Sequence, residues 1–141
     1  MVFTLEGGIN VWAILVSGVI SMVIGFIWYG PLFSKPWSAY TGWTNEKIRS
    51  LSGGSMALTY ILTFLAAVVQ AFVLAVVARS LGATAWSDGL ILGLLAGVGF
   101  TALGFATSFL FEHKPFGFWL IVSGYEVVYL AAAAVVVTVW R

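Results

Sequence analysis

Charged residues are scarce in this chain. Asp, Glu, Lys and Arg make up 8% of its 141 residues, whereas 62% are hydrophobic; soluble domains carry roughly 25% charged residues. So few charges cannot cover a globular surface that faces water, but a lipid bilayer requires an apolar exterior over most of a protein. The composition therefore argues against a water-soluble fold.

Cysteine is absent, which excludes disulfides, a thiol nucleophile and thiolate metal sites. The net charge is +1 and the basic residues are scattered, so the sequence has no cluster of positive charge that could bind nucleic acid. The single histidine, His113, has only Glu112 beside it, whereas catalytic zinc sites generally use three protein ligands. No GxSxG, Walker or GxGxxG motif occurs in a suitable setting. We therefore expect no enzyme activity, metal, cofactor or nucleic-acid partner.

Long apolar runs dominate what is present. Four of them lie at about residues 9–29, 56–78, 89–111 and 116–140. At about 1.5 Å per residue, each is long enough to cross the roughly 30 Å hydrocarbon layer as a helix. Lipid cannot form hydrogen bonds with backbone N–H and C=O groups, so spans of this kind must be helical. We expect an all-α polytopic membrane protein, an antiparallel bundle of four transmembrane helices forming one domain over residues 1–141.

The N-terminal run does not resemble a cleaved signal peptide, because Glu6 stands where a basic region is expected. We expect it to be retained as the first span. Pro31 lacks an N–H, so this span is predicted to stop near Gly30. The residues around that end are assigned as an anchor at the membrane interface: Trp28, Tyr29, Pro31, Phe33, Lys35 and Trp37.

The loop of residues 30–55 interleaves basic and aromatic residues, which is typical of a segment lying on lipid headgroups. A short interfacial helix is predicted from a cap at Thr44 or Asn45 through Leu51, ended by Gly53 and Gly54. The other two loops are short, and Ser87 or Asp88 is expected to cap the third span.

Orientation follows from Lys and Arg, which favour the cytoplasmic side. Four of the six lie in the loop at 30–55 and the turn after the third span, against two on the other side. We therefore expect both termini outside, in a prokaryotic cytoplasmic membrane.

Two rows of small residues predict helix contacts. They are Ala13, Ser17, Ser21 and Gly25 in the first span, and Gly93, Gly97, Thr101 and Gly104 in the third. In lipid, helices associate through close van der Waals contact and hydrogen bonds, so such rows mark where they meet. Packing within one chain is the favoured interpretation, and a homo-oligomer contact is the alternative.

Glu126 is the most informative residue. It lies about 15 Å into the fourth span, near the bilayer middle, where a carboxylate is expensive. We expect it to be neutral or to face polar partners within the protein. The rise per residue places four polar residues of the other spans at a similar depth: Gln70, Ser17, Ser21 and Thr101. Tyr129 and Ser123 lie one turn from Glu126 on the same face of its helix.

These residues admit two interpretations. One is a substrate or proton site in which Glu126 changes charge, lined by Gln70, Ser17, Ser21, Thr101 and Tyr129. The other is a neutral glutamic acid that bonds Gln70 or Ser17 and fixes helix register.

Four stretches carry a resemblance to a known family. They are Asn10-Val11-Trp12-Ala13-Ile14, WYGPLFSKPW, LFEHKP and LIVSGYEVV. They resemble the domain-of-unknown-function family 1761 of small prokaryotic membrane proteins. The resemblance implies a four-helix membrane domain and no agreed activity. We expect that family to vary after the Gly-Tyr pair, where this chain has Glu126.

Two functional classes remain as hypotheses. The first is a small oligomeric transporter or channel-like protein with Glu126 as protonatable centre. The second is a structural or accessory subunit that packs against other membrane proteins. Both have the lipid bilayer as their surroundings.

Overall fold

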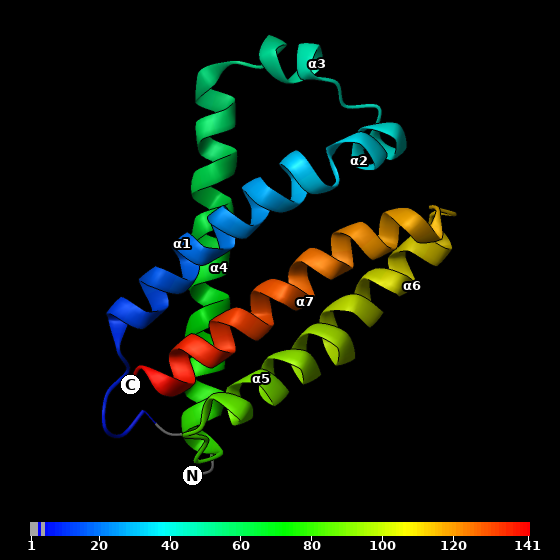
Figure 1. Cartoon of the computed structure of the whole chain (residues 1–141). Coiled ribbons are helices and arrows are strands. Elements are labelled where there is room, and N and C mark those ends of the chain that lie inside the picture. Colours follow the sequence, from blue (N-terminus) through cyan, green and yellow to red (C-terminus); the bar gives the residue numbers. More distant parts are fainter. Residues whose placement is uncertain (1–2, 4) are drawn as a thin grey trace.

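The computed structural model describes residue 3 and residues 5–141, and this part of the chain contains helices and no strand (Figure 1). The α-helices are α1 (Val11–Ile27), α2 (Ser34–Thr41), α3 (Asn45–Ser50), α4 (Gly53–Ser80), α5 (Trp86–Leu94), α6 (Leu103–Phe111) and α7 (Phe116–Val139). Two π-helices, η1 (Trp28–Leu32) and η2 (Leu95–Ala102), continue α1 and join α5 to α6.

Four helical stretches are long and apolar enough to cross a membrane: Val11–Leu32, Gly53–Ser80, Trp86–Phe111 and Phe116–Val139. The predicted all-α class with four potential spans is therefore confirmed. It supports a multi-pass protein surrounded by lipid.

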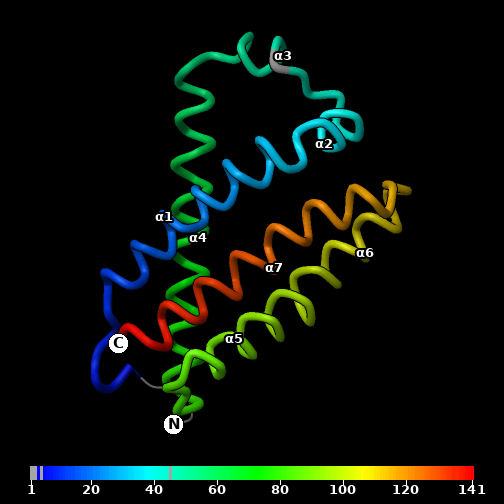
Figure 2. Tube along the Cα trace, in the orientation of Figure 1, coloured from blue at the N-terminus to red at the C-terminus, as the bar shows by residue number. Residues whose placement is uncertain are grey.

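Helix α7 is central to the arrangement. It packs against α1, α4, α5 and η2, and it runs alongside the α5–η2–α6 helix (Figure 1). Helix α4 crosses α1 and α7 at a steep angle, so the regular antiparallel bundle is not confirmed. The start of α1 and the end of α7 lie at the same end of the molecule (Figure 2).

The crossing with α4 is built from small side chains. Ala67, Ala71 and Ala75 of α4 are buried there, with Ala13 of α1 and Ala133 of α7 among the core residues around them. Small residues let backbones approach, which is how helices gain van der Waals contact in lipid. Ser17 and Ser21 from the first predicted row are buried as well, and Gly25 lies 3.7 Å from the Tyr125 ring when given a Cβ.

The contact between α5–η2 and α7 is closer still. A Cβ added to Gly93 would come within 2.5 Å of the Ala131 Cα, and one added to Gly97 within 2.9 Å of the Val127 Cα. Backbone atoms cannot rotate away as side chains do, so these two positions tolerate no side chain. Gly104 differs: nothing lies within 4 Å of an added Cβ, so it takes no part in packing within this chain.

The first span does not stop at Gly30 as the proline predicts. The helix continues as η1 through Pro31 to Leu32. The Phe33 N–H donates to the Trp28 carbonyl, five residues earlier, over 2.9 Å. Pro31 has no N–H for an ordinary α-helical bond, and the wider π turn lets the chain pass the proline without leaving the helix.

The loop at 30–55 contains two helices. The predicted α3 is present, and its Thr44 hydroxyl accepts from the Lys47 N–H over 3.2 Å. Helix α2 was not predicted, although its signals are in the sequence: Pro36 lies in the first turn, and Gly42 ends the helix with a φ of 73°.

Two predicted helix boundaries were wrong. Gly53 and Gly54 do not form a break but begin α4, because Ser52 caps that helix by accepting from the Ser55 N–H. Helix α5 starts after Ala85, so Ser87 and Asp88 lie inside it. Asp88 instead reaches back, and its Oδ2 accepts from the Thr84 and Ala85 N–H groups.

Replacing Gly93 with alanine should therefore weaken the fold. Overpacking a contact of this kind costs about 1–3 kcal/mol, so the variant should unfold at lower temperature in detergent. Gly104→Ala is the matched control and should be neutral or slightly stabilising, since alanine favours helix by about 1 kcal/mol over glycine. Equal unfolding temperatures for the two variants would contradict the packing described for Gly93.

Candidate functional site

Glu126 lies half-buried near the middle of α7. The Gln70 side chain of α4 forms a hydrogen bond with its carboxyl group, which links the two crossing helices. The second oxygen, Oε2, is buried and has no hydrogen-bond partner among residues 3 and 5–141. The carboxyl group thus has a buried oxygen that is free to take a proton or a ligand.

Three tyrosines surround this carboxyl group. Tyr29, Tyr125 and Tyr129 are each close enough to interact electrostatically with Glu126. All six Lys and Arg residues of the chain lie outside the four potential spans or, in the case of Arg79, at the end of one. A negative charge on Glu126 would therefore have a hydrogen-bond donor but no counter-ion, which is a costly state in a low-dielectric interior.

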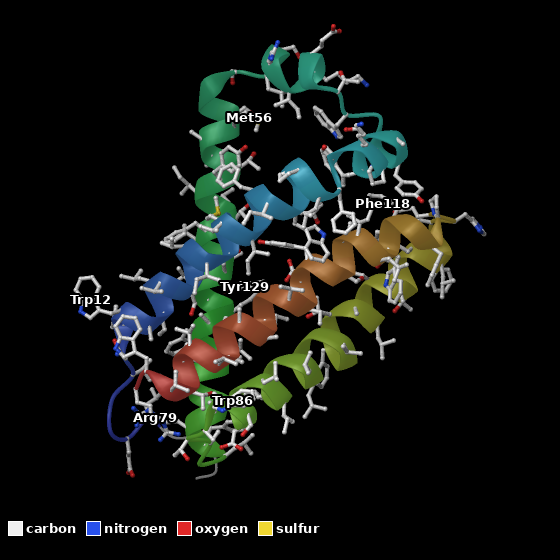
Figure 3. All side chains as sticks on the ribbon, viewed as in Figure 1. Trp12, Met56, Arg79, Trp86, Phe118 and Tyr129 are labelled. Carbon is white, nitrogen blue, oxygen red and sulfur yellow. The ribbon has the colours of Figure 1, made fainter. Side chains whose placement is uncertain are left out.

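Tyr129 does not bond Glu126 as its position on the helix suggested. It is only 1% exposed, and its hydroxyl donates to the Ala67 carbonyl of α4 over 2.5 Å (Figure 3). The tyrosine side chain is long enough to reach the backbone of the crossing helix beyond the carboxyl group. Ser123, the other expected donor, has a buried Oγ with no hydrogen-bond partner in the described chain.

The serines of α1 are also bound elsewhere. Ser17 donates to the Ala13 carbonyl of its own helix over 2.8 Å. The Ser21 hydroxyl lies 2.7 Å from that of Tyr125, which also donates to the Ser21 carbonyl over 3.1 Å. Ser21 is therefore connected to the Glu126 region through Tyr125, a residue that was not predicted from the sequence.

Thr101 was predicted to line the same layer. It lies half-buried in η2, the segment whose Gly97 packs against Val127 of α7. At the end of η2, the Trp119 indole N–H donates to the Ala102 carbonyl over 2.8 Å. A π-helix displaces backbone hydrogen bonds, and in lipid such carbonyls need a partner from within the protein.

The residues assigned as an interface anchor also serve to hold helices together. The Trp28 indole N–H donates to the Ile121 carbonyl of α7 over 2.9 Å. Its ring lies directly over Gly124, where an added Cβ would come within 2.8 Å. The Tyr29 ring packs against Trp37, with ring centroids 5.9 Å apart, and against Tyr125, at 5.5 Å.

The remaining anchor residues are arranged around these contacts. The Phe33 ring packs against Trp28, with centroids 4.8 Å apart. Pro31 and Lys35 are exposed. The motif thus divides into side chains that join η1 to α7 and side chains that face the surroundings.

A groove of about 720 Å³ opens beside this layer. It lies between α1 and the first half of α4, below α3, and it ends at Ser21 and Tyr125. Its walls include Met22 and Phe26 of α1 and Met56 of α4. Neither Glu126 nor Gln70 is among the residues that line it, so groove and carboxyl group are neighbouring but separate features.

His113, the only histidine of the sequence, lies in the turn between α6 and α7. His113 adopts a left-handed φ of 55° directly after α6. Lys114 pairs with Glu112 over 2.6 Å. No cluster of three or more potential metal ligands is found within the described residues.

Replacing Tyr129 with phenylalanine should remove the bond to Ala67 without creating a large cavity. We expect a loss of about 0.5–1.5 kcal/mol in the free energy of unfolding, the net worth of one such bond. Tyr60→Phe is the control. Tyr60 is 43% exposed, so removing its hydroxyl group should leave the free energy of unfolding unchanged. Thermal unfolding in detergent measures both, and equal behaviour would argue against the Tyr129 bond.

Comparisons with known proteins identify the family and nothing beyond it. Neither a search of characterised proteins nor one of solved structures finds a match. One family model, described as "Protein of unknown function (DUF1761)", matches residues 12–138, nearly the whole chain. The chain therefore belongs to this family, which confirms the resemblance noted in its sequence.

Proposed function

We propose that the protein is a small oligomeric transporter or channel-like protein in which Glu126 is the protonatable centre. One observation carries the proposal: a mid-membrane carboxyl group has a free, buried oxygen and no counter-ion. Ionisable groups within the membrane are costly to keep and commonly mark ion or substrate pathways.

The Gln70 amide suits a carboxyl group that changes charge. An amide offers both donors and an acceptor, so it can donate to a carboxylate and accept from a protonated acid. The contact between α4 and α7 at Glu126 then survives both states. A proton, an ion or a small cation is the class of substrate that such a site would take.

The proposed site keeps Glu126 and Gln70 and adds the Ser21–Tyr125 hydroxyl pair beside them. Tyr129 and Ser17 act in the proposal as packing residues, because their hydroxyls are bound to backbone carbonyls. Thr101 has a place only if a pathway passes along η2.

The large groove of one copy is not lined by Glu126 or Gln70, so it does not supply a conduit to this site. The proposal therefore includes a homo-oligomer, in which neighbouring copies complete the pathway. It also retains the orientation with both termini outside, based on the Lys and Arg distribution. Catalysis is not part of it.

The rival proposal is a structural or accessory subunit for other membrane proteins. The Glu126–Gln70 bond favours it, because a permanently neutral glutamic acid would hold α4 against α7 equally well. Such a subunit should retain a membrane-protein partner after mild detergent extraction. Its assembly should be unchanged in Glu126→Gln, which preserves shape and hydrogen bonding.

Flux in proteoliposomes separates the two proposals. We expect proton or cation flux with the unaltered protein and only the background of protein-free vesicles with Glu126→Gln. Glu112→Gln is the matched control, since Glu112 is a carboxylate paired with Lys114 in the turn, and it should retain flux. Equal flux in the unaltered protein and Glu126→Gln would remove Glu126 from the pathway, and absence of flux from all three would abandon transport.

A further inference from the structure

The groove between α1 and α4 has the dimensions of one lipid chain. It extends along α4 from Ser55 to Thr63, which lie about 12 Å apart along the helix axis. One leaflet of the hydrocarbon layer is about 15 Å thick. Its volume of about 720 Å³ falls within the roughly 300–1,000 Å³ typical of ligand pockets.

Four hydroxyl groups that line it are already bonded within the protein. The Thr59 and Thr63 hydroxyls donate to carbonyls of their own helix, over 3.0 and 2.8 Å. At the inner end, the Ser21 and Tyr125 hydroxyls bond each other. These four hydroxyl groups therefore need no hydrogen bond from an occupant, and a hydrocarbon chain fits the part of the groove that they line.

The outer end has a different character. Ile48 of α3 and Leu51, directly after this helix, line the groove beside Trp37 and Trp43. In Figure 1, α3 lies above the space between α4 and α1. Tryptophan favours the headgroup level of a membrane, so the outer end lies where lipid headgroups are found.

Basic side chains border this outer end. Lys47 and Arg49 flank Ile48 in α3 and are exposed, as is Lys35 near Trp37. Glu46 is the only acidic residue between residues 30 and 55, so the loop carries three positive charges against one negative. A basic rim above an apolar groove complements an anionic amphiphile.

We infer that this groove binds a phospholipid with an anionic headgroup. One acyl chain occupies the space between α1 and α4, and the headgroup lies against Lys47 and Arg49. This site meets the proposed transport site at Ser21 and Tyr125, but it uses neither Glu126 nor Gln70. The bound chain would fill the gap that α4 leaves as it diverges from α1 (Figure 2).

Native mass spectrometry of the full chain in detergent tests the headgroup. The probes are phosphatidylglycerol and phosphatidylcholine with identical dioleoyl chains. We expect preferential retention of phosphatidylglycerol, and a fall in that preference of about fivefold for each basic residue removed in Lys47→Gln and Arg49→Gln. Lys114→Gln is the control, because Lys114 lies in the other turn, paired with Glu112.

A second pair of variants tests the groove. Thr59→Phe places a ring in it and should weaken retention of both lipids by roughly tenfold. Thr107→Phe is the matched control: Thr107 is equally exposed and bonds its own helix in the same way, but it lies on α6 and should change nothing. Circular dichroism confirms that both variants are folded.

Three results would overturn the inference. They are equal retention of the two lipids by the unaltered protein, unchanged preference in the Lys47 and Arg49 variants, and equal retention by Thr59→Phe and Thr107→Phe. A dimer that dissociates in Thr59→Phe without loss of lipid would assign the groove to a second copy of this chain instead. Transport by Glu126 is unaffected by any of these outcomes.

Discussion

Close backbone contact along α7 is the constraint on which the rest of the structure depends. Helices in lipid gain little from hydrophobic association, so they must approach until van der Waals contact is extensive. Gly93 and Gly97 allow this on one side of α7, and the alanines of α4 allow it on another. Every other feature of the molecule is positioned by these two contacts.

Aromatic donors provide the second kind of link between helices. Trp28, Trp119 and Tyr129 each donate a hydrogen bond to a backbone carbonyl of a different segment: Ile121, Ala102 and Ala67. A polar group without a partner is costly in lipid, so each bond both satisfies its donor and fixes the spacing of two elements. Two of these bonds lie beside π-helical segments, where regular helical bonding is displaced.

The two proposed sites differ in chemistry because their surroundings differ. Glu126 lies where α4 crosses α7, and the crossing encloses it with Gln70 and the tyrosines. The groove lies where α4 has separated from α1, and four of its lining hydroxyls are already bonded within the protein. One steeply inclined helix thus produces an enclosed polar position at its middle and an apolar groove along its first half.

Much of the fold could be predicted from the sequence, because lipid imposes strong limits. Length, continuity and apolar character sufficed for four helical spans, and the small-residue rows indicated where helices meet. The prediction that the first span ends before Pro31 was wrong, because a π turn accommodates the proline. Whether this turn forms depends on neighbouring contacts such as that of Trp28 with α7. Helix α2 was missed although Pro36 and Gly42 marked it.

Only part of the candidate site could be predicted from the sequence. Depth along a helix correctly brought Gln70 to Glu126, but it does not determine the rotation of one helix against another. That rotation sends the Tyr129 hydroxyl to Ala67 and pairs Ser21 with Tyr125. The sequence by itself determined four apolar helices and one acid near the middle of the last, since these follow from composition and spacing, and its motifs indicated the family. Only the tertiary structure decided which polar groups meet and where a groove opens, because both depend on the angle at which α4 crosses its neighbours.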